Sequence, residues 1–380
     1  MEGEMKYTLS ITQRCNLACE YCYIAKRPEV MSLEMARKAV DFLFHHAGAE
    51  QKIHIGFFGG EPLLEFGLLA EITRLIEQHP AAAGRRVELA VVTNGTVWNG
   101  EIADFLNAHN IKLCLSCDGP SDVQDRFRRT ARGKGTSARV ERTIRQAQAS
   151  LRETVLVNAV YRPETLRSLP ATVEYLSGLG LREIYLSPDY SAPWSRADTK
   201  ALPEVYRAVA ELYMAYYRTK DPHFISLIDS KLVVLLRGGY QPLERCSMGR
   251  RELAFTPNGF LYPCDRLIGA ADGKAHCIGH VDRGIDLASL ACRRPAEPPS
   301  STMCGDCGFR DYCMHWCACS NYFLTGSYGR VAPFLCASER AVIQTTFDVF
   351  VTLGQDLGPV FVHHVNGAPQ ANLRPSVLAA

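Results

Sequence analysis

Three cysteines lie close together near the start of the chain, Cys15, Cys19 and Cys22, with the spacing C-x3-C-x2-C. Thiolates are the soft ligands that hold iron–sulfur clusters in proteins. A [4Fe–4S] cluster takes four ligands, so three clustered cysteines would leave one iron for a ligand from outside the protein. A zinc knuckle is the alternative, but it needs a fourth Cys or His close by. The next histidines are His45 and His46.

A larger group of cysteines lies in the last third of the chain. Cys246 and Cys264 frame Gly259 in a C-x12-G-x4-C pattern. A C-x2-C-x5-C-x3-C run and one final cysteine complete the group, with Cys304, Cys307, Cys313, Cys317 and Cys336. Zinc is the rival metal here, because C-x2-C and C-x3-C are also zinc-like spacings.

Composition and charge narrow the class of protein. The 380 residues are 47% hydrophobic and 22% charged, as in a globular protein long enough for two cores. The net charge of +2 indicates neither nucleic acid nor an anionic membrane as partner. No apolar run approaches the length of a bilayer span, and the N-terminus lacks the pattern of a signal peptide. Fifteen cysteines in such a chain indicate metal binding rather than disulfides, and we expect a reducing, cytoplasmic location.

The cysteines of the first motif must be positioned by the strands and helices around them. The sequence predicts strands that alternate with helices. The expected strands are Lys6–Thr12, Lys52–Phe58, Val87–Val92, Lys112–Ser116, Thr154–Val160 and Glu183–Ser187. The expected helices are Ser32–Ala47, Leu68–Gln78, Glu101–His109, Leu169–Leu179, Glu204–Thr219, Ser226–Leu236 and Ser338–Val351. This βα series predicts an α/β fold, a partial (β/α)6 TIM-like barrel that is open. The loops at the carboxyl ends of such strands carry the chemistry.

Polar turns follow several of these strands. The first motif follows the first strand, and Gly59-Gly60-Glu61-Pro62 follows the second. Thr93-Asn94-Gly95 follows the third, although an Asn-Gly pair is also an ordinary turn. The fourth strand ends at Ser116, with Asp118 and Arg128 downstream. Asp118 could order its own turn instead of contacting a ligand. Arg126, Arg129 or Arg132 could take the place of Arg128 as the arginine that contacts a ligand.

The first motif, its flanking aromatics and the Gly-Gly-Glu-Pro turn resemble the radical S-adenosylmethionine (SAM) superfamily. The resemblance implies that Cys15, Cys19 and Cys22 hold a [4Fe–4S] cluster whose free iron binds SAM. It also implies a set of SAM contacts: Tyr21, Gly59, Gly60, Glu61, Thr93, Asn94, Ser116, Asp118, Arg128 and Leu186. In this set the Gly-Gly-Glu turn receives the SAM amine. Ser116 contacts the ribose or carboxylate, Arg128 the carboxylate, and Leu186 or its neighbours the adenine.

The later cysteines resemble the SPASM extension of radical SAM enzymes, which carries auxiliary iron–sulfur clusters. The resemblance implies two auxiliary [4Fe–4S] clusters. The distal one would be held by Cys304, Cys307, Cys313 and Cys336, and the proximal one by Cys246, Cys264 and Cys317. Sulfatase-maturating members have a further ligand between the first two proximal cysteines, and this chain has none there. Either the proximal cluster has an open iron, or Cys277, Cys292 or Cys319 fills the position.

The residue after Cys264 is Asp265, which matches the general base of sulfatase-maturating enzymes. The resemblance implies that Asp265 takes a proton from the substrate radical while an electron leaves for the auxiliary cluster. The alternatives are a surface pair with Arg266 or a carboxylate that binds amides of the cluster loop. Residues 1–220 are expected to form the radical SAM barrel, 221–245 a bridging helix and linker, 246–337 the SPASM domain, and 338–380 a C-terminal helix and tail. The pair His363-His364 in that tail is expected at the surface.

The resemblance as a whole implies an oxidoreductase that splits SAM to a 5′-deoxyadenosyl radical and abstracts hydrogen from a peptide residue. The expected product is a thioether or carbon–carbon crosslink in a ribosomally made peptide. The alternative is an anaerobic sulfatase-maturating enzyme that makes formylglycine from Cys or Ser. Phe58, where those enzymes typically carry Gln, argues against the alternative. The expected partners are a peptide or protein substrate and a low-potential electron donor, flavodoxin or ferredoxin. A non-enzymatic electron carrier and a zinc-binding module are hypotheses from other classes.

Overall fold

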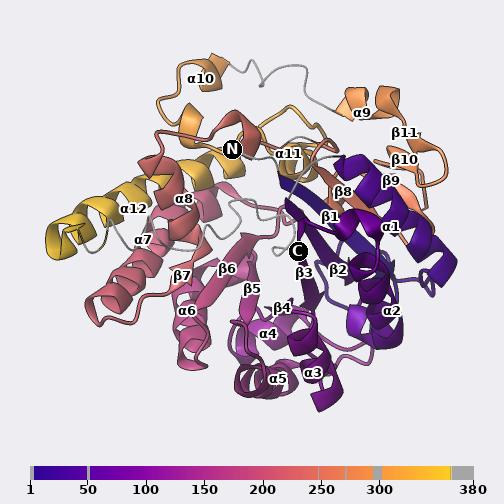
Figure 1. Cartoon of the computed structure of the whole chain (residues 1–380). Coiled ribbons are helices and arrows are strands. Elements are labelled where there is room, and N and C mark those ends of the chain that lie inside the picture. The colour runs from indigo at the N-terminus through magenta and orange to yellow at the C-terminus, as the bar shows by residue number, and fades with distance from the viewer. Residues whose placement is uncertain are drawn as a thin grey trace.

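The computed structural model describes residues 4–48, 52–246, 248–269, 272–293, 302–359 and 361. Across these residues runs one mixed sheet with the strand order β11-β10-β9-β8-β1-β2-β3-β4-β5-β6-β7 (Figure 1). Its strands are β1 (Glu4–Thr12), β2 (Lys52–Gly59), β3 (Arg86–Thr93), β4 (Ile111–Ser116), β5 (Leu156–Tyr161), β6 (Glu183–Pro188), β7 (Phe224–Ile225), β8 (Glu252–Phe255), β9 (Phe260–Tyr262), β10 (Gly279–His280) and β11 (Gly284–Ile285).

Strands β1 to β7 are parallel, and each pairs with the next in sequence order. The other side of β1 pairs with β8, also in parallel, with Lys6 opposite Glu252. β1 therefore does not close onto β7, and the barrel stays open. Strands β8 to β11 are antiparallel to one another. The α/β fold with a partial barrel, predicted from the sequence, is confirmed.

The helices are α1 (Leu33–Ala47), α2 (Phe66–Glu77), α3 (Gly100–Ala108), α4 (Ser121–Phe127), α5 (Ser137–Ser150), α6 (Leu169–Gly178), α7 (Arg196–Arg218), α8 (Ser226–Leu236), α9 (Leu287–Arg293), α10 (Thr302–Gly305), α11 (Ala318–Thr325) and α12 (Pro333–Leu357). Most of them lie around the outside of the parallel strands, whereas α9 lies beside β11 and α10 lies at the top of the view, away from the sheet (Figure 1). Both faces of β1 are buried, including Tyr7 and Leu9 on one face and Thr8 and Ser10 on the other. Parallel sheets are covered on both faces in this way because their crossover helices pack against them.

Some elements differ from the sequence expectation. Helix α7 begins at Arg196 and not at Glu204, because Ser195 and Asp198 form a capping box and Pro203 is accommodated inside the helix. Helix α12 begins at Pro333, in the first turn, where the missing amide hydrogen is tolerated. Helices α4 and α5 and strands β7 and β8 were not expected. Their sequences are short or mostly polar, and β8 is held by a partner more than 240 positions away.

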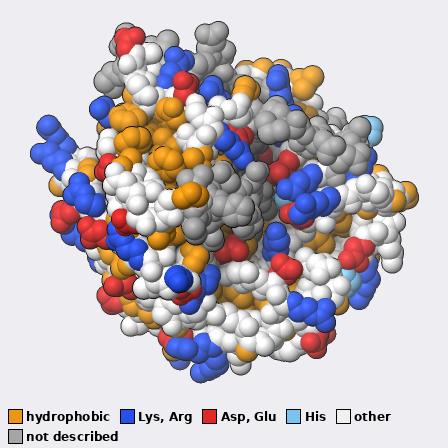
Figure 2. Space-filling view, turned by 60° about the vertical axis from the view of Figure 1, so that its left-hand side comes forward, with side chains coloured by type: hydrophobic (Ala, Val, Ile, Leu, Met, Phe, Trp, Pro, Cys, Tyr) orange, Lys and Arg blue, Asp and Glu red, His pale blue; other side chains and the backbone are white. Residues whose placement is uncertain are grey.

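The surface carries no strong charge pattern on the face seen in Figure 2, where basic and acidic side chains are interspersed. Within the described ranges, none of the helices combines the length and the apolar character that a membrane span requires. The sequence expectation for the tail, including His363-His364, lies outside the described residues.

The ends of β1 and β2 approach each other unusually closely. The amide of Gly60 donates to the carbonyl of Thr12 at 2.8 Å, and the amide of Glu61 donates to the carbonyl of Arg14 at 2.8 Å. A Cβ atom added to Gly60 would lie 2.0 Å from the Arg14 carbonyl oxygen. Gly59 has a φ of +133°, which favours glycine, and its added Cβ would lie 2.1 Å from the Thr12 carbonyl oxygen. Only glycines allow this contact.

We expect Gly60→Ala to lower the free energy of unfolding by about 3 kcal/mol, because backbone on both sides must move to make room for the methyl group. Chemical denaturation of the apoprotein measures this loss. Gly67→Ala is the matched control, since an added Cβ at Gly67 meets nothing within 4 Å and the residue lies in helix α2. Equal stability of the two variants would contradict the close contact.

Candidate functional site

A cavity opens at the carboxyl ends of the parallel strands, with about 1000 Å³ of empty space including its mouth. Cys15, Cys19 and Cys22 all line it, and they come from the loop between β1 and α1. Among its described lining residues there is no fourth cysteine and no histidine. The donor set therefore fits an iron–sulfur cluster with one iron left to a ligand in the cavity, and it lacks the fourth ligand of a zinc knuckle.

The cysteine loop is held from two sides. Its Ala18 and Glu20 amides donate to the carbonyls of Arg129 and Phe127, at 2.7 and 3.1 Å. The side chain of Asn16 donates to Thr96 Oγ1 at 2.7 Å and accepts from Asn94 Nδ2 at 3.0 Å. These contacts come from the loop after β3 and from the end of α4 with the residues after it, so the loop that carries the thiols is fixed by two neighbouring segments.

Seven of the ten residues expected to contact SAM line the cavity. They are Tyr21, Gly59, Gly60, Thr93, Asn94, Ser116 and Arg128. The structure places the remaining three, Glu61, Asp118 and Leu186, elsewhere. Leu186 on β6 lines a second cavity instead, while the next residues, Ser187, Pro188 and Asp189, line the first.

Glu61 is fully buried behind the cavity wall. Its Oε1 accepts from Thr93 Oγ1 at 2.7 Å and from the Leu63 amide at 3.0 Å, and its Oε2 accepts from the Asn94 amide at 2.7 Å. Burial raises the pKa of Glu61 to about 7, and the three hydrogen bonds oppose this rise. Its side chain thus orders the loop after β3, and that loop faces the cavity.

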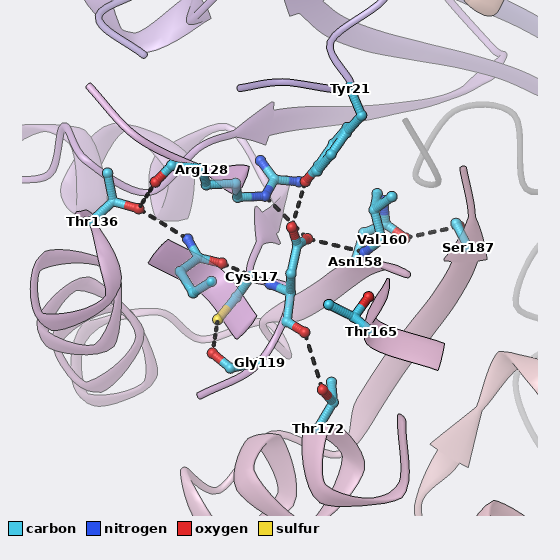
Figure 3. Close-up of polar contacts among 12 residues, drawn as sticks. Tyr21, Cys117, Gly119, Arg128, Thr136, Asn158, Val160, Thr165, Thr172 and Ser187 are labelled. Atoms are coloured by element: carbon cyan, nitrogen blue, oxygen red, sulfur yellow. Dashed lines mark hydrogen bonds and ion pairs between the residues drawn. The ribbon is translucent and has the colours of Figure 1, made fainter. Parts of the chain in front are cut away.

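Asp118 is a second buried carboxylate behind the wall. Tyr21 donates its hydroxyl to Asp118 Oδ2 at 2.5 Å, and Arg128 Nε lies 3.0 Å from Oδ1 in an ion pair. Oδ1 also accepts from the amide of Val160 at 3.0 Å. Figure 3 shows Tyr21, Arg128 and Val160 converging on this point from three separate segments. Tyr21 and Arg128 line the cavity, so Asp118 orients two cavity residues without lining the cavity itself.

Several cavity residues were not anticipated from the sequence. Lys26 lies four residues beyond Cys22, and Asp189 follows β6. Asp189 Oδ2 lies 3.2 Å from Arg162 Nε, and Arg162 also pairs with Glu20 of the cysteine loop at 2.8 Å. The position of Asp189 directly after a strand was the only signal that could have indicated it.

A group of buried thiols lies beyond the cavity, where the β8–β9 hairpin meets α11. Cys317 Sγ lies 3.6 Å from Cys319 Sγ, and the thiols of Cys264 and Cys319 are hydrogen-bonded. Cys246 packs against the same buried cluster of side chains. Cys246 precedes β8 and Cys264 follows β9, so antiparallel pairing brings both to one end of the hairpin. Cys292 is exposed on α9, and Cys277 donates to the Gly279 carbonyl at 3.2 Å.

Four further cysteines form a third group. Cys304 lies in α10, Cys307 and Cys313 lie in the segment after it, and Cys336 lies in the first turn of α12. All four are half-buried free thiols. Burial raises the pKa of Cys336, and the proximity of Cys304 and Cys307 raises it further. The fold therefore brings the four thiols expected at the distal cluster into one neighbourhood.

Asp265 is buried, and it does not line either of the two cavities described here. Its Oδ1 accepts from the Arg266 amide at 2.8 Å and lies 3.3 Å from Cys264 Sγ. Burial and, to a smaller extent, the nearby Glu252 raise its pKa to about 7. The structure excludes the surface pair with Arg266 considered from the sequence. The side chain of Arg266 instead lines both cavities and lies over the ring of Tyr190.

Comparison with known proteins agrees with this geometry. Residues 9–176 match the family described as the radical SAM superfamily. The chain is 24% identical to a serine-type anaerobic sulfatase-maturating enzyme of Klebsiella aerogenes over 86% of this chain and 84% of the relative. It is 25% identical to the mycofactocin maturase MftC of Mycobacterium ulcerans, over 85% of each chain.

Solved structures show the same fold at lower identity. The structure of native anSMEcpe with bound AdoMet superposes with a TM-score of 0.76 at 17% identity, over 93% of this chain and 99% of that one. Streptococcus suis SuiB bound to the precursor peptide SuiA superposes with a TM-score of 0.61 at 16% identity, over 88% of this chain and 76% of that one. Residues 9–176 therefore form a radical SAM domain, and the chain is an enzyme.

Proposed function

We propose that this enzyme oxidises a residue of a peptide and forms a thioether or carbon–carbon crosslink in a ribosomally made precursor. The observation that supports this most is the pairing of two features. Three thiols without a fourth protein ligand face a cavity, and two further groups of thiols lie beyond it. A reaction that leaves the substrate redox-neutral has no electron to remove, whereas an oxidation needs acceptors of this kind.

The first three thiols are proposed to hold a [4Fe–4S] cluster and SAM, which together supply a radical that abstracts hydrogen from an unactivated C–H bond. Around that site the residues of this chain bind SAM and orient it. Arg128 is fixed by Asp118 beside Tyr21 and faces the cavity, where a guanidinium suits the SAM carboxylate. Glu61 is proposed as a positioning residue that holds the Thr93–Asn94 loop against the ligand. The buried walls exclude water from the reacting carbon.

Cys319 is proposed to complete the proximal auxiliary centre with Cys246, Cys264 and Cys317. Cys317 Sγ lies 3.6 Å from Cys319 Sγ, and Cys319 is hydrogen-bonded to Cys264, so these thiols already lie together. The proximal and the distal group are each proposed to hold a [4Fe–4S] cluster.

The second candidate function is the oxidation of Cys or Ser to formylglycine. It is favoured by the sulfatase-maturating relatives of Klebsiella aerogenes and Clostridium novyi, which align with 86% and 67% of this chain. In both reactions the substrate loses one hydrogen atom, one electron and one proton. Asp265 is the proposed acceptor of that proton. A low-potential flavodoxin or ferredoxin is the proposed electron donor to the first cluster.

Mass spectrometry of a candidate peptide tests the proposal. We expect the anaerobically reconstituted enzyme with SAM and dithionite to form 5′-deoxyadenosine and a peptide that has lost two hydrogens and does not react with a hydrazide. An aldehyde that reacts with the hydrazide would support formylglycine instead. The control is the triple variant Cys15→Ala, Cys19→Ala, Cys22→Ala, which should make no 5′-deoxyadenosine. If the wild-type enzyme forms no 5′-deoxyadenosine, both candidate functions are wrong.

The ligand set of the proximal centre can be tested separately. We expect Cys319→Ser to lose up to about four irons per chain, because a hydroxyl is a poorer ligand for iron than a thiolate. Iron analysis and electron paramagnetic resonance (EPR) of the reduced protein measure the change. Cys277→Ser and Cys292→Ser are the controls and should keep wild-type iron. If one of these controls loses the iron and Cys319→Ser keeps it, the assignment of Cys319 is wrong.

The role of Glu61 can be tested by a single substitution. We expect Glu61→Gln to lower the free energy of unfolding by roughly 1–3 kcal/mol, because an amide nitrogen would face a donor from Asn94, Thr93 or Leu63. SAM affinity should fall by about tenfold if the loop shift costs about 1.4 kcal/mol of binding. Denaturation and equilibrium dialysis measure the two effects. The control is Glu65→Gln, which loses only an ion pair with the exposed Arg14. Such a pair contributes less than about 1 kcal/mol to the free energy of unfolding.

A further inference from the structure

A buried ion pair joins helices α8 and α12 close to the distal group of cysteines. Lys231 Nζ lies 2.6 Å from Glu339 Oε2, and the two side chains are 5% and 9% exposed. Removing two such charges from water is costly, and replacement of a buried pair by apolar residues is often neutral or stabilising. Stability alone therefore does not account for this pair.

Both charged groups also bind the backbone on either side of Cys313. Lys231 Nζ donates to the carbonyl of Tyr312 at 3.0 Å, and the amide of Met314 donates to Glu339 Oε2 at 2.6 Å. The amide of Tyr240 donates to the carbonyl of Asp311 at 2.8 Å. The segment before and after the cysteine is thus held at successive peptide groups by two helices and the turn after α8.

Helix α12 connects this contact to the rest of the protein. Cys336 lies one turn before Glu339, so the helix that holds the Cys313 segment also carries another thiol of the distal group. Between them, Ser338 Oγ lies 2.8 Å from the hydroxyl of Tyr206, which lies 2.8 Å from the hydroxyl of Tyr161 on β5. Adjacent positions of one helix thus contact the barrel and the cysteine segment.

We propose that Lys231 and Glu339 are positioning residues for the distal iron–sulfur centre, which fix Cys313 at the correct distance from Cys336. The inference rests on the ligand set proposed above. Groups that orient metal ligands from outside the coordination shell commonly affect metal affinity and redox potential. The pair also lines the second cavity, which shares Arg266 and Tyr190 with the first. It therefore lies between the distal centre and the region next to the SAM cavity.

The double variant Lys231→Met, Glu339→Leu tests the proposal in the full-length, anaerobically reconstituted enzyme. It removes both charges together, so no unpaired charge is left buried. We expect its melting temperature to stay within about 5 °C of the wild type. We also expect it to lose up to about four irons per chain, with loss or broadening of the EPR signal of the distal centre. Wild-type iron and an unchanged EPR spectrum would overturn the proposal.

A second variant and two controls make the test specific. Glu339→Gln keeps an acceptor for the Met314 amide but removes a negative charge, so iron should stay and the midpoint potential of the distal centre should rise. An unchanged potential in Glu339→Gln counts against the proposal even if the double variant aggregates. Arg218→Met with Asp356→Asn removes an exposed ion pair between α7 and α12 and should change nothing measured.

Cys313→Ala separates a failure of the positioning pair from a failure of the proposed centre. It should lose the distal signal outright. If Cys313→Ala keeps its full iron, the distal centre is not held by this group and the positioning role fails with it. If only the double variant keeps its iron, the centre stands and the role of the pair alone is overturned.

Discussion

The close backbone contact between the ends of β1 and β2 is the constraint from which the cavity is built. Gly59 and Gly60 let the second strand end against the carbonyls of Thr12 and Arg14, directly before the cysteine motif. Glu61, the next residue, reaches Thr93 and Asn94 after β3. Asn94 Nδ2 then returns to Asn16 and lies 3.7 Å from Cys15 Sγ. Three strand ends are thereby joined in a closed ring of contacts, and each contact limits the position of the thiols.

Two buried carboxylates, Glu61 and Asp118, connect the loops behind the cavity wall. Each accepts from donors on segments that are separate in the sequence, and hydrogen bonds to charged groups contribute about 1.5–3 kcal/mol each. A buried acceptor that lost these donors would be unsatisfied, so the loops and the carboxylates depend on one another. This dependence explains how irregular segments can form a defined cavity. Their order comes from polar contacts at strand ends as much as from apolar packing.

Much of this could be predicted from the sequence, because parallel strands direct their following loops to one edge. The turns after β1, β2, β3 and β4 were all recognisable from their glycines and polar residues, and residues from each of them line the cavity. What the sequence did not reveal was the direction of individual side chains. Glu61 and Asp118 carry the chemistry of ligand-binding groups, but the backbone turns them inward, toward amides of the loop after β3 and of strand β5.

Contacts between distant segments were the other part that the sequence could not indicate. The pairing of β8 with β1 joins positions more than 240 residues apart, and four residues of mixed character give no sign of it. The capping box of Ser195 and Asp198 is visible in the sequence, but a proline inside a helical pattern, here Pro203, normally ends or kinks a helix. Of the position expected near the adenine, Leu186 or its neighbours, the neighbours Ser187 and Pro188 line the first cavity, whereas Leu186 lines only the second.

The three groups of cysteines are positioned by three different physical means. The first group lies on a loop after a parallel strand, and contacts from the neighbouring loops hold it in place. The second combines the two ends of an antiparallel hairpin with the first residues of α11, where Cys317 is the N-cap. Partial positive charge at a helix N-terminus favours thiolates there. The third depends on α12, which carries Cys336, contacts the barrel through Ser338 and holds the Cys313 segment through Glu339. A movement of α12 would therefore change the third group relative to the barrel, while the first group, fixed by β1 and β2, would stay in place.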